Sequence, residues 1–279
     1  MSGTCVTGIH ISRTAVRIAE FGRGRLLKRL REVPLSFWRE PARKRGPRLP
    51  FLVPRGFAAI STHEAHFKNI GEAHSGAGGS LAERAKQLEG HLRGVEDLLC
   101  DFFAVAGYVG QPPQGCVAVA RAAAVRRCLE IMESVGVRPG GVDVEILALF
   151  RLWRISLPTI GGELVGIAHA DGGTVSAGIF DCSVPLVMRQ VVCDGPRPSR
   201  EAVEGFVGAL ALEVGRGLPA RILATGAEQA AAGADLLASI SLAPEIAGPE
   251  SAGLRQRSMV AIAAAAARPM SRRGARSWR

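Results

Sequence analysis

The turn Asp171-Gly172-Gly173-Thr174 holds the residues of this sequence that are best suited to chemistry. A glycine-bearing turn can cradle a phosphate through its backbone N–H groups. The same residues are equally typical of a plain hairpin turn that needs no ligand. His169 precedes this turn, and His10 precedes a second short connection, Ser12-Arg13. We interpret both histidines as neutral strand residues that line a cleft.

Several common catalytic and metal-binding patterns are missing from the sequence. Its six cysteines are scattered without a CxxC pair, which is typical of reduced, buried cysteines in a cytosolic protein. His63 and His66 lie three residues apart, but HEAH is not the HExxH of a zinc site. No GxxxxGK[ST] loop and no Ser-His-Asp or Cys-His arrangement stands out. We therefore expect no bound metal.

Two groups of three short strands would position the turns. The predicted ranges are Val6–Ser12, Thr14–Phe21 and Arg25–Val33 in the first group, and Leu164–Ala170, Thr174–Phe180 and Pro185–Val192 in the second. The connections are short, and several contain glycine, so each group is predicted to form an antiparallel meander.

The two groups share a spacing of residues. In each, a histidine lies eleven residues before a phenylalanine, as in His10 to Phe21 and His169 to Phe180. A Gly-Ile pair precedes each histidine by a few positions. These units begin about 160 residues apart and indicate an internal duplication.

The rest of the chain alternates between strand and helix patterns. Strands are predicted at Phe57–Thr62, Gly115–Ala120, Val142–Val144 and Arg221–Ala224. Helices are predicted at Ser80–Leu92, Val95–Val105, Ala122–Val135 (ended by Gly136), Glu145–Trp153, after the N-cap Ser199, and in Ala-rich segments to Ala267. Meanders followed by α/β crossovers, twice over, predict an α/β fold with two related lobes and a ligand cleft between them.

Composition sets outer limits on the type of protein. A chain of 279 residues with 47% hydrophobic residues can bury a substantial core in one large domain or two smaller ones. Such apolar content excludes a mainly disordered chain. No apolar stretch approaches the roughly 20 residues of a membrane-spanning helix, and the first residues do not resemble a signal peptide.

The net charge of +10 is concentrated in two regions. Residues 21–55 hold eleven basic and two acidic side chains, and residues 268–279 hold five basic ones, so the remainder is mildly acidic. Arg39–Arg48 and Arg272–Arg279 are therefore basic appendages that suit proximity to an anionic membrane surface. Nucleic-acid binding is less expected, because only Trp38 and Trp278 could stack near these clusters and no nucleic-acid fold signature is present.

The sequence resembles the PilM-type family of actin-like ATPases, which act in type IV pilus assembly and related secretion platforms. The resemblance spans residues 5 to 268. It is carried by the opening meander from Gly8 to Val33, the passage GVRPGGVDVEILALFR at 136–151, LEVGRGL at 212–218 and ILATG at 222–226. The order and spacing of these pieces make the case.

The resemblance implies a duplicated actin-like (RNase H-like) two-lobe α/β fold with a shortened helical subdomain in the second lobe. Residues 1–56 would begin the first lobe, and 57–142 would form a small inserted α/β lobe as in FtsA and PilM. Residues 143–162 would form a connecting helix, 163–268 the second lobe, and 269–279 a disordered basic tail.

By resemblance, ATP and Mg²⁺ are the expected cofactors, but both phosphate turns depart from the family pattern. His10 and His169 stand where acidic residues would hold Mg²⁺ and its waters, and the glycines of these turns are replaced by Ser12 and Asp171. The implied nucleotide-binding residues are Ser12, Arg13, Thr14, Asp171, Gly172, Gly173, Thr174 and Gly226. Glu145 takes the position of a water- or metal-orienting carboxylate, or it is simply a helix-start glutamate.

The implied function is a cytoplasmic scaffold, peripheral at the inner membrane, with weak or lost ATP binding. Its partner would be the cytoplasmic tail of a single-span, PilN-like membrane protein. That tail would lie in a groove near Ala59–Phe67 and Val117–Ala120. An active actin-like ATPase or sugar-kinase-like enzyme is the alternative, and a basic nucleic-acid-binding protein is a lesser one.

Overall fold

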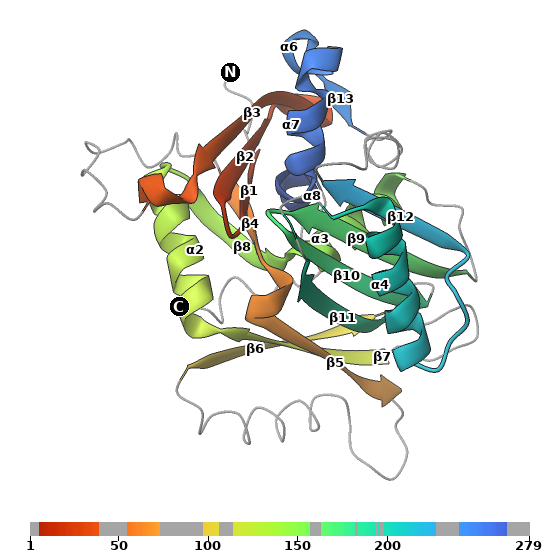
Figure 1. The fold of residues 1–279 in the computed structure, drawn as a ribbon. Coiled ribbons are helices and arrows are strands. Elements are labelled where there is room, and N and C mark those ends of the chain that lie inside the picture. Colours follow the sequence, from red (N-terminus) through yellow and green to blue (C-terminus); the bar gives the residue numbers. More distant parts are fainter. Residues whose placement is uncertain are drawn as a thin grey trace.

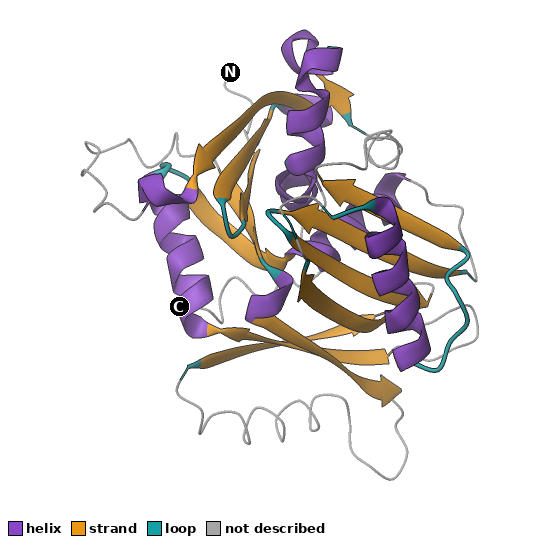
Figure 2. Ribbon diagram, in the orientation of Figure 1, coloured by secondary structure: helices purple, strands orange, loops and turns teal. Residues whose placement is uncertain are grey.

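The computed structural model describes residues 6–38, 55–72, 97–105, 114–156, 163–181, 184–193, 195, 198–226 and 240–266. These residues form three β-sheets with helices between and outside them (Figures 1 and 2). The predicted helix Ser80–Leu92 and both basic appendages lie outside the described residues.

A six-stranded sheet contains the first meander, as predicted. Its order is β13-β3-β2-β1-β4-β8, with β1–β2 and β2–β3 antiparallel and the other pairs parallel. The strands are β1 Val6–Ile11, β2 Ala15–Phe21, β3 Leu26–Pro34, β4 Arg55–Ile60, β8 Arg138–Val144 and β13 Ser241–Leu242.

A four-stranded sheet repeats this arrangement and confirms the predicted duplication. Its order is β11-β10-β9-β12, with an antiparallel meander and one parallel crossover strand beside the first strand. The strands are β9 Leu164–Asp171, β10 Thr174–Asp181, β11 Val184–Val192 and β12 Arg221–Gly226. β12 stands beside β9 as β4 stands beside β1.

The third sheet corrects one prediction. Residues 95–105 were expected to form a helix, but Leu98–Val105 is strand β6, paired antiparallel with β7 (Gln114–Arg121). A short apolar run such as LLCDFFAV suits a buried strand as well as a helix, and the neighbouring strand decides between them. β5 (Ala65–Glu72), which the sequence patterns did not predict, completes the order β5-β7-β6.

Helices and sheets alternate in layers. α2 (Ala122–Ser134) packs on one face of the six-stranded sheet, while α3 (Glu145–Ser156) and α8 (Met259–Ala266) lie between this sheet and the four-stranded one. α4 (Arg200–Glu213) covers the outer face of the four-stranded sheet. Figure 1 shows these layers around the centre of the molecule.

Local capping follows the sequence predictions. The Ser199 side chain accepts a hydrogen bond from the Ala202 N–H at the start of α4. Gly136 ends α2 with a φ of 71°, and its N–H donates to the Glu133 carbonyl at 2.8 Å. A left-handed glycine is the common way for a helix to end, and here it turns the chain toward β8.

Equivalent glycines in the two meanders let helices approach the strands closely. A Cβ on Gly8 of β1 would overlap the Ala261 carbonyl of α8 and lie 2.8 Å from the Ala265 Cβ. A Cβ on Gly166 of β9 would overlap the Val207 side chain of α4. The Gly-Ile pairs of the duplication therefore mark helix-packing positions.

The C-terminal segment of the described chain returns to the first sheet. β13 pairs with β3, and α8 packs on β1 and β4. Between them lie α6 (Pro244–Ala247) and α7 (Ala252–Arg257). That residues 57–142 form a separate small lobe stays a prediction. The two ends of this range, in β4 and at the start of β8, belong to the six-stranded sheet. Its middle forms the separate sheet β5-β7-β6.

Candidate functional site

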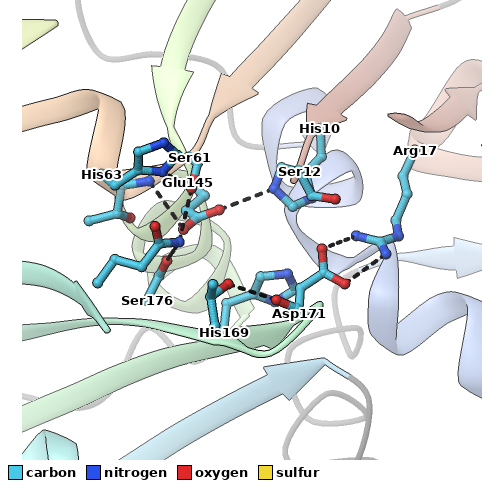
Figure 3. Close-up of polar contacts among 12 residues, drawn as sticks. His10, Ser12, Arg17, Ser61, His63, Glu145, His169, Asp171 and Ser176 are labelled. Atoms are coloured by element: carbon cyan, nitrogen blue, oxygen red, sulfur yellow. Dashed lines mark hydrogen bonds and ion pairs between the residues drawn. The ribbon is translucent and has the colours of Figure 1, made fainter. Parts of the chain in front are cut away.

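The two polar turns of the duplicated meanders meet at the centre of the molecule. The β1–β2 turn approaches the β9–β10 turn so closely that a Cβ on Gly172 would lie 2.9 Å from the Thr14 Cγ2. Gly172 and Gly173 have positive φ values of 55° and 76°, which suit glycine in a tight turn. Figure 3 shows the side chains that surround this junction.

An ion pair joins the two turns across the junction. Both terminal nitrogens of Arg17 donate to the Asp171 carboxylate, each at 2.8 Å (Figure 3). The Arg17 Nε donates to Glu32 at 2.6 Å. Arg17 is only 2% exposed. Burial alone would raise the pKa of Asp171, but its hydrogen bonds with Arg17 hold that pKa well below its usual range. Arg257 of α7 also donates to Glu32, at 3.2 Å.

A second buried contact involves Glu145 at the start of α3. Its carboxylate accepts a hydrogen bond from His10 Nε2 at 3.1 Å and another from the Thr62 backbone N–H at 3.2 Å. Burial alone would raise the pKa of Glu145, but the bond with His10 lowers it to about 2. Because an ionised carboxylate only accepts hydrogen bonds, the Nε2 of His10 carries a proton. Each of the two carboxylate oxygens of Glu145 thus accepts a hydrogen bond from the protein itself.

His169 lies beside His10 but has different partners. The rings contact edge to face with centroids 5.4 Å apart, and His169 Nδ1 lies 2.9 Å from the Thr225 hydroxyl. The same hydroxyl is 3.4 Å from the Ala168 carbonyl oxygen. If the Thr225 hydroxyl donates its proton to the Ala168 carbonyl, it can accept one from the Nδ1–H of His169. A neutral His169 ring with its proton on Nδ1 therefore fits this geometry. Burial, followed by the nearby His10, lowers the pKa of His169 to about 4.

The structure gives the sequence-predicted site residues mainly internal partners. The Ser12 hydroxyl donates to the Ala15 carbonyl and accepts from the Ala15 N–H, both at 3.1 Å. The Thr174 hydroxyl donates to the Asp171 carbonyl at 2.7 Å. Arg13 is exposed, and Gly226, with a φ of 111°, lies against the Ala170 backbone. The predicted residues Ser12, Arg13, Thr14, Gly172 and Gly173 are brought together at the junction, as are Asp171 and Thr174.

Arg17 is a residue of the junction that sequence reasoning missed. It lies in β2 between Ala15 and Ala19, and both alanines are buried. An arginine on the same strand face as two buried alanines indicates a buried ion pair, because a charged side chain is seldom fully buried without a partner. The sequence alone did not indicate that this partner is Asp171, 154 residues away.

The comparison with solved structures identifies the fold. A structure described as the PilM–PilN type IV pilus biogenesis complex matches 93% of this chain and 97% of that one, with 14% identity and a TM-score of 0.63. The chain has a PilM-type actin-like fold. An actin-like ATPase-fold protein of Bacteroides thetaiotaomicron matches at a TM-score of 0.48 and 11% identity, covering 86% of this chain and 90% of that one. No protein-family model and no curated protein sequence matches the chain.

The PilM-type fold implies a magnesium nucleotide, and the residues at the junction are poorly suited to one. Magnesium prefers oxygen ligands, whereas His10 and His169 present nitrogen atoms, and the Asp171 and Glu145 carboxylates are held by Arg17 and His10. Within the described ranges, no group of three or more His, Cys, Asp or Glu residues could hold a metal ion. The two turns also contact each other directly at Gly172 and Thr14.

The segments expected to receive a partner tail contain both exposed and buried side chains, with His63 and His66 exposed. Ala59, Val117 and Ala120 are buried, and Phe67 is half-buried against the side of β11. None of the helices in the described part of the chain has the length and apolar character needed to cross a bilayer.

The low pKa of His169 predicts a loss of stability in mild acid. In the unfolded chain this histidine takes up a proton near pH 6.5, whereas in the folded chain it does so near pH 4. The unfolded state therefore binds more protons between these values, and stability falls as the pH drops from 6.5 to 4. We expect a loss of about 3 kcal/mol from this residue.

Urea unfolding of the wild type and of His169→Gln at pH 7, 5.5 and 4.5 measures this effect. The variant lacks the titrating group, so its unfolding free energy should change less over this range. Parallel pH curves for the two proteins would contradict the assignment. Glu145 contributes at lower pH, because its pKa falls from 4.5 to about 2 on folding.

Proposed function

We propose that this chain is a nucleotide-independent, actin-like scaffold of a type IV pilus or a related secretion assembly. It acts on the cytoplasmic side of the inner membrane and binds the cytoplasmic tail of a single-span membrane partner. Its role is to hold that partner in place rather than to catalyse a reaction. ATP binding is weak or lost.

The observation that carries the proposal is the ion pair between Arg17 and Asp171. In an actin-like ATPase the two hairpin turns flank the phosphates of a bound nucleotide, so closure of the lobes depends on the ligand. Here a buried guanidinium–carboxylate contact with two parallel hydrogen bonds connects β2 of the first meander directly to the β9–β10 turn of the second. The chain therefore supplies with its own side chains the bridging charge that a nucleotide and its metal would otherwise supply.

Glu145 supports the same proposal. A carboxylate that orients an attacking water needs a free oxygen directed into the cleft. Both oxygens of Glu145 instead accept hydrogen bonds from His10 and Thr62, and the side chain is 3% exposed. Its role is to tie α3 to β1 and to the segment that follows β4.

The partner assignment draws on the solved structure that is similar over nearly its whole length and is described as a complex of PilM with PilN. A scaffold with this fold is expected to bind a PilN-like membrane protein. The expected partner is a single-span membrane protein, and its gene is expected to lie beside this one, together with genes for a secretin and motor ATPases.

Calorimetric titration with ATP, with and without Mg²⁺, tests nucleotide independence. We expect no binding in the micromolar range and no release of phosphate. Micromolar, Mg²⁺-dependent binding with phosphate release would instead support the active ATPase or sugar-kinase-like alternative.

The partner assignment is tested separately with a fluorescent peptide that carries the cytoplasmic tail of the neighbouring membrane protein. Saturable binding without ATP is expected, and a scrambled peptide serves as the control. Binding that appears only after ATP is added would overturn nucleotide independence, and no binding under either condition would overturn the partner assignment.

A further inference from the structure

The strand register gathers basic residues at the end of the six-stranded sheet opposite the polar turns. One row of paired residues crosses the sheet at this end. It runs through Leu27 of β3, Phe21 of β2, Val6 of β1, Arg55 of β4 and Arg138 of β8. The row therefore marks a continuous end surface. Five adjacent strands give it a width of about 19 Å.

This surface, which we call the basic sheet end, is formed by exposed side chains from four parts of the chain. They are Arg23 and Arg25 in the β2–β3 turn, Lys28 and Arg29 at the start of β3, Arg55 in β4 and Arg138 in β8. No ion pair connects any of them to another described residue, and Arg55 lies over the Phe57 ring at 5.4 Å. Their charges are thus available to a partner.

Acidic residues near the basic sheet end are few. Glu20 of β2 is paired with Arg31 of β3. Glu133, in the last turn of α2, and Glu245 of α6 are exposed nearby. The basic side chains outnumber these acids, so the surface carries a net positive charge. In Figure 1 this end lies at the top of the view, beside β13 and α6.

The sequence next to this surface adds further positive charge. The segment that leads into Arg55 contains Arg39, Arg43, Lys44, Arg45 and Arg48, with Glu40 as its one acid. Phe21 and Phe57, the aromatic residues near this surface, are buried, so the exposed lysines and arginines suit a charged plane better than stacked bases.

We propose that the basic sheet end docks on an anionic lipid bilayer and orients the scaffold with its polar junction away from the membrane. This goes beyond the proposed function, because lipid binding here needs no protein partner. Each basic residue near an anionic surface strengthens binding about five-fold. Several together give a reversible attachment that weakens as salt is added.

Vesicle flotation of the full chain tests this proposal. The vesicles contain either phosphatidylcholine alone or equal parts of phosphatidylcholine and phosphatidylglycerol. The wild type should float only with the anionic vesicles. The triple variant Arg23→Glu, Arg29→Glu and Arg138→Glu should bind them at least about a hundred-fold more weakly, because it removes three positive charges and adds three negative ones.

A matched control has the same change in net charge at other places on the surface. It carries Arg127→Glu, Arg154→Glu and Arg221→Glu, three exposed arginines that lie away from the basic sheet end. This control should retain most of the vesicle binding, because both variants keep the basic segments outside the described residues.

Three results would overturn the proposal. The first is equal loss of binding in both triple variants, and the second is no flotation of the wild type. The third is retention on duplex DNA or RNA without binding to anionic vesicles, which would favour a nucleic-acid partner. Since the vesicles contain no protein, failure here is distinguishable from failure of the tail-peptide experiment.

Discussion

Replacing Arg17 with alanine is expected to lower the free energy of unfolding by about 3 to 5 kcal/mol. The change removes the ion pair that Asp171 makes within the described part of the chain and leaves this buried carboxylate uncompensated. Glu32 keeps its contact with Arg257 at 3.2 Å. Urea unfolding at pH 7 measures the loss, and hydrogen exchange in 6–21 and 164–181 reports whether the two turns separate.

Two further variants show whether the loss of stability comes from the buried pair of hydrogen bonds between Arg17 and Asp171. Arg17→Lys keeps the charge but cannot donate two parallel hydrogen bonds, so it should recover only part of the stability. Arg189→Ala removes an exposed pair with Glu213 and should cost less than about 1 kcal/mol. Similar losses for Arg17→Ala and Arg189→Ala would show that the contact between the turns is not a buried ion pair in solution.

Adding a single methyl group at Gly8 is expected to destabilise the fold by about 3 kcal/mol or more. A Cβ there would overlap the Ala261 carbonyl oxygen and press on Ala265, so α8 would have to move away from β1. The Ala261 carbonyl belongs to the helix backbone, so it cannot move aside as the end of a flexible side chain can. Thermal unfolding followed by circular dichroism measures the effect of Gly8→Ala.

Gly205→Ala is the matched control for this substitution. Gly205 lies within α4, and a Cβ there meets no atom within 4 Å. Because alanine favours a helix over glycine, this variant should be more stable by about 0.5 to 1 kcal/mol. If Gly8→Ala were as stable as the wild type, the close packing of α8 on β1 would be wrong.

The sequence predicted the two meanders because local features define them. Short glycine-bearing connections, strand-length apolar runs and the repeated histidine spacing are all readable within about 30 residues. The N-cap at Ser199 and the glycine end of α2 at Gly136 were predicted for the same reason. In each case the deciding interaction lies within a few residues of the pattern.

Interactions between distant segments were beyond the sequence patterns. The segment 98–105 forms a strand because β7 lies beside it, a contact that its own apolar run does not reveal. Asp171 departs from the glycine of the family pattern, and its partner Arg17 lies 154 residues away in the sequence. The roles of the individual turn residues toward a nucleotide stay predictions.

The return of the last helix to the first sheet bears on how the chain is made. During synthesis β1 emerges long before α8, which covers the face of the sheet that holds Gly8. That face stays uncovered until about residue 266 has left the ribosome, whereas the sheet β11-β10-β9-β12 and α4 are complete by residue 226. The half of the protein that is translated first is therefore the half that finishes folding last.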